Sequence, residues 1–143
     1  MSLVMQIMWG TVVLSVCSLI HLVILAWAVG LLTRLGKYTR QHHYSFRWGV
    51  MFSLAFGSVV FAHTVQVWVW AGSFVYMGML PKLASAIYFA LVTYTTVGYG
   101  DVTVGDGFRV YAAMASVTGL LNFGLSTAFL VGLFAKMLPE EEM

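Results

Sequence analysis

Hydrophobic and polar positions divide the chain into three long apolar stretches joined by shorter polar connections. Leu3 to Thr33 contains no charged residue, and two further apolar stretches run from about Trp48 to Ala71 and from about Val110 to Leu138. At a rise of about 1.5 Å per residue, each is long enough to cross a hydrocarbon core of about 30 Å as an α-helix. The pattern therefore predicts three membrane-spanning helices, with the two ends of the chain on opposite sides.

A fourth apolar segment, Leu83 to Tyr94, follows Pro81 and is too short to span a bilayer. We expect it to be a re-entrant helix that enters the membrane and returns on the same side; a helix lying flat at the interface is the alternative. A re-entrant helix would leave the backbone after Tyr94 non-helical at membrane depth. Such backbone is tolerated only where protein buries it or where it lines a water-filled cavity.

Composition supports this interpretation and excludes several classes of function. Of the 143 residues 61% are hydrophobic and 8% charged, whereas soluble domains carry about 25% charged residues. We therefore expect an all-α, multi-pass protein of a cell membrane, with lipids as its surroundings. No basic run with interleaved aromatics predicts nucleic-acid binding. The single Cys17 provides no disulfide framework, and no cluster predicts an enzyme, a metal site or a bound cofactor.

The basic residues predict an orientation. Arg34, Lys37, Arg40 and Arg47 lie, with His42 and His43 and no acidic residue, between the first two apolar stretches. The positive-inside rule makes this connection cytoplasmic, which puts the N-terminus outside and the C-terminus in the cytoplasm. The two histidines could titrate between pH 5 and 8 and modulate gating at that surface; anchoring to the membrane surface is the simpler role.

The segment after the short helix carries the most specific chemistry. It reads Thr95-Thr96-Val97-Gly98-Tyr99-Gly100-Asp101. Backbone carbonyls of four TVGYG loops replace the hydration shell of K⁺ in potassium channels, and Gly98 and Gly100 can adopt the positive φ that such a loop requires. We therefore predict K⁺ coordination by Thr96, Val97, Gly98, Tyr99 and Gly100. One loop cannot surround an ion, so a homotetramer is expected.

From about Trp48 to Leu138, the sequence resembles the potassium channel pore family, with an outer helix, a pore loop and an inner helix. The run from Gly119 to Ala128, GLLNFGLSTA, resembles that of the simple bacterial proton-gated type. The resemblance implies a gating hinge at Gly119 and a pore lining of Leu120, Phe123, Thr127 and Val131. Their spacing fits one helical face, although that face could instead pack on a neighbouring helix and the glycines could be close-packing residues.

The same resemblance implies residues that support the filter. Tyr88 and Phe89 would brace it from behind, Thr95 would support it where it begins, and Asp101 would lie at its outer mouth, where a hydrogen bond from Tyr88 is expected. Val92 occupies the position of a buried glutamate in the proton-gated type. An inactivation mechanism that depends on that glutamate is therefore not expected.

Three segments and one function follow from these observations. Residues 1–47 would form an extra helix with a basic loop, 48–138 the pore domain and 139–143 a short acidic tail. The extra helix lacks the repeated arginines of a voltage sensor. The predicted function is passive, selective K⁺ conduction, in a bacterial inner membrane. A non-conducting accessory subunit and a less selective cation channel are the alternatives.

The polar residues His21, His63, Gln66 and Asn122 are expected to form hydrogen bonds between helices.

Overall fold

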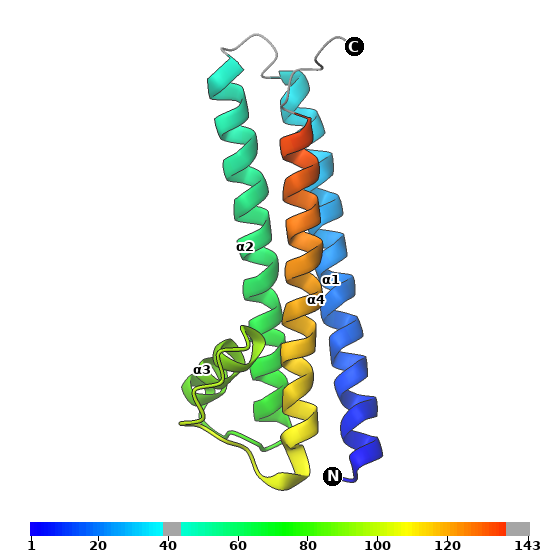
Figure 1. The fold of residues 1–143 in the computed structure, drawn as a ribbon, viewed down its shortest axis with the longest axis vertical. Helices are drawn as coiled ribbons and strands as arrows, with labels where there is room; N and C mark the ends of the chain where they lie inside the picture. Colours follow the sequence, from blue (N-terminus) through cyan, green and yellow to red (C-terminus); the bar gives the residue numbers. More distant parts are fainter. Residues whose placement is uncertain (39–43, 137–143) are drawn as a thin grey trace.

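The structure is a computed structural model that describes residues 1–38 and 44–136. In chain order its elements are α1 (Leu3–Tyr38), α2 (Tyr44–Tyr76), α3 (Leu83–Tyr94), the short 3₁₀ helix η2 (Asp106–Phe108) and α4 (Arg109–Ala135). Helices α1, α2 and α4 are long and apolar enough to cross a membrane, whereas α3 is not. The three long helices run side by side, and the N-terminus lies at the opposite end of the bundle from the end of α4 (Figure 1). The predicted all-helical fold is confirmed for the described residues.

Two of the long helices, α1 and α2, extend beyond the apolar stretches that predicted them. Helix α1 continues to Tyr38, and α2 runs from Tyr44 to Tyr76. Polar and basic residues at a membrane surface can continue a helix, because water can satisfy the backbone groups left unpaired at its end. An apolar stretch thus measures the part of a helix in hydrocarbon, not its full length. The predicted end of the third span at Leu138, the acidic tail and His42 and His43 lie outside the described residues.

Helix α3 has the predicted bounds and packs against α2 and α4. Its last residue, Tyr94, is buried and its hydroxyl donates a hydrogen bond of 2.9 Å to Gln66 Oε1 on α2. Gln66 precedes the end of α2 at Tyr76 by ten residues, or about 15 Å of helix. Helix α3 therefore enters the bundle rather than lying along its end, which agrees with a re-entrant helix (Figure 1).

Helix α1 packs along both α2 and α4. The glycine at position 10 permits a close approach, because a Cβ there would lie 2.6 Å from Cγ of Met114. Near the start of α1, buried Gln6 accepts hydrogen bonds from the backbone N–H groups of Val110 and Tyr111, at 3.0 and 3.4 Å. These N–H groups belong to the first turn of α4, where they have no partner within the helix. The first helix is thus an integral part of the bundle.

Buried and partly buried residues form three layers along the bundle. An apolar cluster around Trp70, Phe74 and Tyr111 lies near the end that carries α3. A second apolar cluster, at the other end, consists of Leu32, Trp48, Met51, Ala55 and Leu133. Between them lies what we call the polar layer: Ser18, His21, His63, Gln66, Tyr94, Asn122 and Ser126. All four α-helices contribute to it.

Candidate functional site

The loop after α3 has an unusual backbone. The φ angles of Thr96, Gly98 and Gly100 are 63°, 57° and 78°, whereas Val97 and Tyr99 have negative φ. Positive φ at the two glycines was predicted; positive φ at Thr96 was not, because the left-handed region is uncommon for residues other than glycine. Backbone conformations that alternate in hand turn successive N–H groups to one side, which leaves the carbonyls to the other. The backbone from Thr96 to Gly100 has this alternation.

Hydrogen bonds hold the first half of the loop against the end of α3. The N–H of Thr96 donates to the carbonyl of Thr93 at 3.0 Å, and the N–H of Gly98 donates to that of Val92 at 3.2 Å. From α4, the Ser116 hydroxyl also donates to the Thr93 carbonyl, at 2.7 Å. The loop is thus fixed where it begins to the end of α3, which is itself bonded to α4.

The other end of the loop is tied back to α3 by the predicted hydrogen bond. The hydroxyl of Tyr88 donates to Oδ2 of Asp101 at 2.6 Å. This bond keeps the phenol protonated and raises the pKa of Tyr88 above its ordinary value. The neighbouring Phe89 ring meets Phe74 of α2 edge to face, with centroids 5.4 Å apart. Tyr88 therefore contacts the loop directly, whereas Phe89 fixes α3 to α2.

The outer surface of the loop is not covered by the chain itself. Every residue from Thr95 to Asp101 is exposed, and Val97 and Tyr99 are 52% and 72% exposed. Exposed apolar and aromatic side chains beside a packed core are typical of a surface that meets another molecule. The loop therefore leaves an apolar and aromatic surface open among the described residues.

Gly119 of α4 lies directly against the end of α3. A Cβ at this position would overlap the backbone carbonyl oxygen of Tyr94 and would lie 3.3 Å from its ring. The glycine is therefore required by helix packing at the base of the loop, one of the two roles that the sequence left open. The hinge role predicted for Gly119 stays a prediction.

The residues predicted to line the pore do not all have the same surroundings. Leu120 and Val131 are 61% and 60% exposed, and Thr127 is exposed as well. Phe123 instead lies against the joint between α2 and α3, with its ring centroid 4.5 Å from that of His63 and 5.7 Å from that of Tyr94. Three of the four thus lie on a free face of α4, while Phe123 is partly covered.

Behind the loop, five side chains of the polar layer form a closed ring of hydrogen bonds. His21 Nε2 lies 3.0 Å from Ser126 Oγ, which lies 3.0 Å from His63 Nε2. His63 Nδ1 lies 2.8 Å from the hydroxyl of Tyr94, which donates to Gln66 Oε1, and Gln66 Nε2 lies 2.7 Å from His21 Nδ1. The ring links α1 to the residue that ends α3.

One arrangement of protons satisfies all five bonds. The amide nitrogen of Gln66 can only donate, so His21 accepts at Nδ1 and donates from Nε2 to Ser126. The hydroxyl of Tyr94 donates to Gln66, so it accepts from Nδ1 of His63, whose Nε2 then accepts from Ser126. Both imidazoles are neutral in this arrangement, and a second proton on His21 would place a donor against the amide nitrogen of Gln66.

Asn122 joins the ring from α4. Its Nδ2 donates to Gln66 Oε1 at 2.6 Å and to Ser18 Oγ at 3.4 Å. The hydrogen bonds predicted for His21, His63, Gln66 and Asn122 are confirmed, but their meeting in one ring was not foreseen. The spacings His63/Gln66 and Asn122/Ser126, which place each pair on one helical face, are the signal that could have indicated it. Within the described part of the chain, no group of three His, Cys, Asp or Glu could hold a metal ion.

Comparison with known proteins gives one match. A family model described as "Ion channel" matches residues 48–136, a range that includes α3, the loop, α4 and most of α2 and leaves α1 outside. No curated protein and no solved structure matches the chain.

Proposed function

Because this chain belongs to the ion channel family, we propose that it is the pore-forming subunit of a potassium-selective channel, which conducts K⁺ passively as a homotetramer. The observation that carries the proposal is the positive φ at every second residue of the loop from Thr96 to Gly100. Four copies of this backbone around one axis would provide rings of carbonyl oxygens, and the Thr96 hydroxyls would add a further ring at the inner end. Such rings replace the hydration shell of K⁺.

The chemistry suits conduction because the ligands carry no net charge. A carboxylate ring would hold a dehydrated cation strongly, whereas neutral carbonyls at several adjacent positions let ions bind and leave. The C-terminal end of α3 carries the partial negative charge of the helix dipole and would favour a cation just inside the loop. Two contacts of Tyr94 support this position for the end of α3: its backbone lies against Gly119, and its hydroxyl donates to Gln66.

The exposed surfaces support assembly around an axis. The loop and the free face of α4 that carries Leu120, Thr127 and Val131 are the parts that partner copies would enclose. In this arrangement α4 lines the inner cavity, and we assign the gate to bending of α4 near Gly119. The positive-inside rule would place the N-terminus outside, and a bacterial inner membrane is the proposed location.

Ion flux into liposomes tests the proposal. The purified protein should pass K⁺ far better than Na⁺ and should have the mass of four chains in detergent. Substitution Gly98→Ala should abolish or strongly reduce this flux, because alanine resists the φ of 57° found there. Gly78→Ala is the matched control: its φ is 68°, it also has open space for a Cβ, and it lies outside the loop. Equal Na⁺ and K⁺ flux would contradict selectivity, and absence of flux with a different partner bound would favour an accessory subunit.

A further inference from the structure

A cavity of about 510 Å³ opens between α1, α2 and α4 at the end of the bundle opposite α3. Its floor is formed by Leu32, Met51 and Leu133, all of which are buried. Val29 and Phe129 add further apolar wall. A space of this kind can hold part of a hydrocarbon chain, and in a membrane the molecules that surround it are lipids.

Small residues create the space. Gly36 on α1 and Ala128 and Gly132 on α4 line the cavity where larger side chains would fill it. A Cβ on Gly132 would meet no heavy atom within 4 Å, and one on Gly36 would only touch the terminal methyl of Met51, at 3.8 Å. The cavity can therefore be filled by substitution without displacing a helix.

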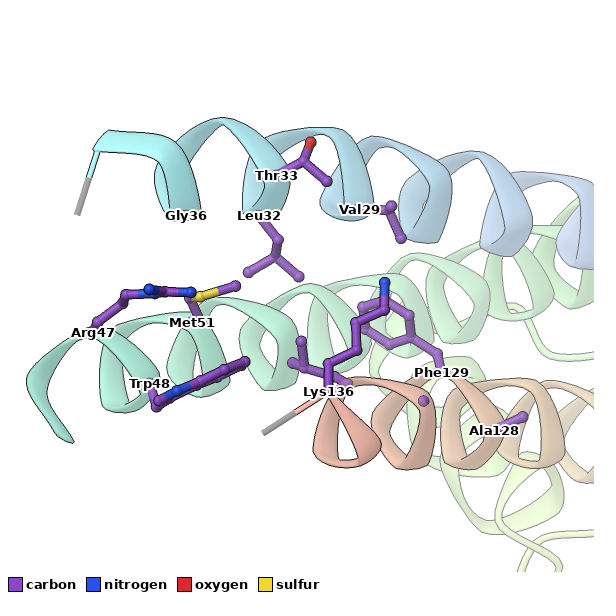
Figure 2. A pocket seen from close by; sticks show the side chains of 12 residues that line it. Val29, Leu32, Thr33, Gly36, Arg47, Trp48, Met51, Ala128, Phe129 and Lys136 are labelled. Atoms are coloured by element: carbon purple, nitrogen blue, oxygen red, sulfur yellow. The ribbon is translucent and has the colours of Figure 1, made fainter. Parts of the chain in front are cut away.

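Two cationic side chains lie at this apolar space. Arg47 lies in the first turn of α2 and Lys136 directly follows α4, and Figure 2 shows both reaching into the gap toward α1. The guanidinium of Arg47 lies 5.4 Å from the ring centre of Trp48, and its Nε is buried without a hydrogen-bond partner in the described chain. The one salt bridge among the described residues joins Arg109 and Asp106, near the other end of the bundle. Neither cation of the cavity is neutralised by an acidic side chain of the described residues.

We propose that this cavity is a binding site for an anionic phospholipid, with an acyl chain among Leu32, Phe129 and Leu133 and the phosphate between Arg47 and Lys136. The charges are complementary, and a basic pocket between membrane helices is the setting in which anionic headgroups bind. A zwitterionic lipid lacks the net charge that two cations select. The α1 wall of the site and Arg47 lie outside residues 48–136, so the part of the chain that matches the ion channel family carries only part of the site.

Native mass spectrometry of the full chain tests this directly. The protein is reconstituted with phosphatidylglycerol and phosphatidylcholine of identical acyl chains, extracted in mild detergent and weighed with its retained lipids. We expect wild type to retain phosphatidylglycerol preferentially. Each of Arg47→Gln and Lys136→Gln should weaken retention about fivefold, since one basic residue near an anionic surface contributes about 1 kcal/mol. Gly132→Leu should also release the lipid, by filling the cavity at unchanged charge.

Matched variants and competitors distinguish binding in this cavity from attraction to the basic surface around it. Arg34→Gln and Lys37→Gln remove equal charge at the same end from residues that do not line the cavity, and they should leave retention unchanged. Glycerol phosphate, which offers the headgroup without chains, should not compete.

Equal losses of phosphatidylglycerol retention in all four charge variants, or full retention by Gly132→Leu, would overturn the proposal. It would also fail if phosphatidylglycerol bound only after Glu140, Glu141 and Glu142 were changed to Gln, because the acidic tail would then be the occupant. None of these measurements depends on ion flux, so the lipid site is tested independently of channel activity.

Discussion

The polar layer and the cavity beside Arg47 and Lys136 join the same three long helices in opposite ways. In the polar layer, hydrogen bonds of 2.6 to 3.4 Å join side chains of α1, α2 and α4 to one another and, through His63 and Gln66 of α2, to Tyr94 of α3. At the cavity, two glycines and an alanine leave a space between the same helices, and another molecule can enter it. The first region can fix the position of the loop, whereas the second can respond to the membrane. Variants of the layer should therefore affect folding and ion selectivity, and variants of the cavity should affect lipid binding.

Gly119→Ala should give the largest effect. The new Cβ would overlap the Tyr94 carbonyl, which is backbone and cannot rotate away. Overpacking of this kind costs up to about 3 kcal/mol, and relief would require α4 to move away from the end of α3. We expect a lower unfolding temperature and reduced K⁺ over Na⁺ selectivity in liposome flux. Gly124→Ala, where a Cβ meets nothing within 4 Å, is the control; an equal loss in both variants would show that the Tyr94 contact is not the cause.

Gln66→Leu should be the next most damaging substitution. Leucine matches the size of the amide but leaves Tyr94, Asn122 and His21 each without one partner. Interhelical hydrogen bonds in membranes contribute about 0.6 kcal/mol each, and up to about 1.7 kcal/mol. We therefore expect a loss of about 2 kcal/mol in thermal unfolding in detergent. Thr64→Val, which changes an exposed hydroxyl on the same helix, should lose far less, and similar losses would argue against the ring.

His21→Leu tests whether α1 acts on the loop through the ring. This change removes two bonds, to Gln66 and Ser126, and should lower stability by about 1 kcal/mol. Because Gln66 also holds Tyr94, selectivity should fall along with stability. Leu22→Ala, at an exposed position on α1, should leave selectivity intact. Unchanged selectivity in His21→Leu would mean that the first helix only supports the bundle.

Tyr88→Phe should have a smaller and more local effect. It deletes the hydroxyl that donates to Asp101 but keeps the ring. The pair is exposed, so the loss of stability should be the smallest of these substitutions in the loop and the polar layer. The expected readout is faster loss of K⁺ current during sustained conduction, because the outer end of the loop would no longer be tied to α3. Currents identical to wild type would show that this bond does not hold the conducting loop.

Neutralising the cavity should have the smallest effect on folding. In a neutral detergent, Arg47→Gln and Lys136→Gln should each shift the free energy of unfolding by less than about 0.5 kcal/mol. When phosphatidylglycerol is added, wild type should gain stability, because a ligand that binds only the folded state stabilises it. The variants should gain less. If wild type and the two variants gained equal stability from phosphatidylglycerol, the cavity would not differ from the polar layer in its response to lipid.

The sequence by itself determined the parts of this protein that depend on local pattern. Length and hydrophobicity gave the spanning helices, and Leu83–Tyr94 was predicted with both of its ends. Gly98 and Gly100 predicted positive φ, and the Tyr88 to Asp101 bond followed from resemblance. These features could be predicted because partition into a membrane and backbone freedom are properties of short segments.

Only the tertiary structure decided which distant residues meet. His21 contacts Gln66 across 45 positions of sequence and Ser126 across 105, and Gly119 fits the end of α3 only because α4 crosses it there. The positive φ of Thr96 and the cavity beside Arg47 and Lys136 likewise depend on how several helices pack. Periodicity places a side chain on a face of its helix. Which partner that face meets is decided by packing among elements far apart in the chain.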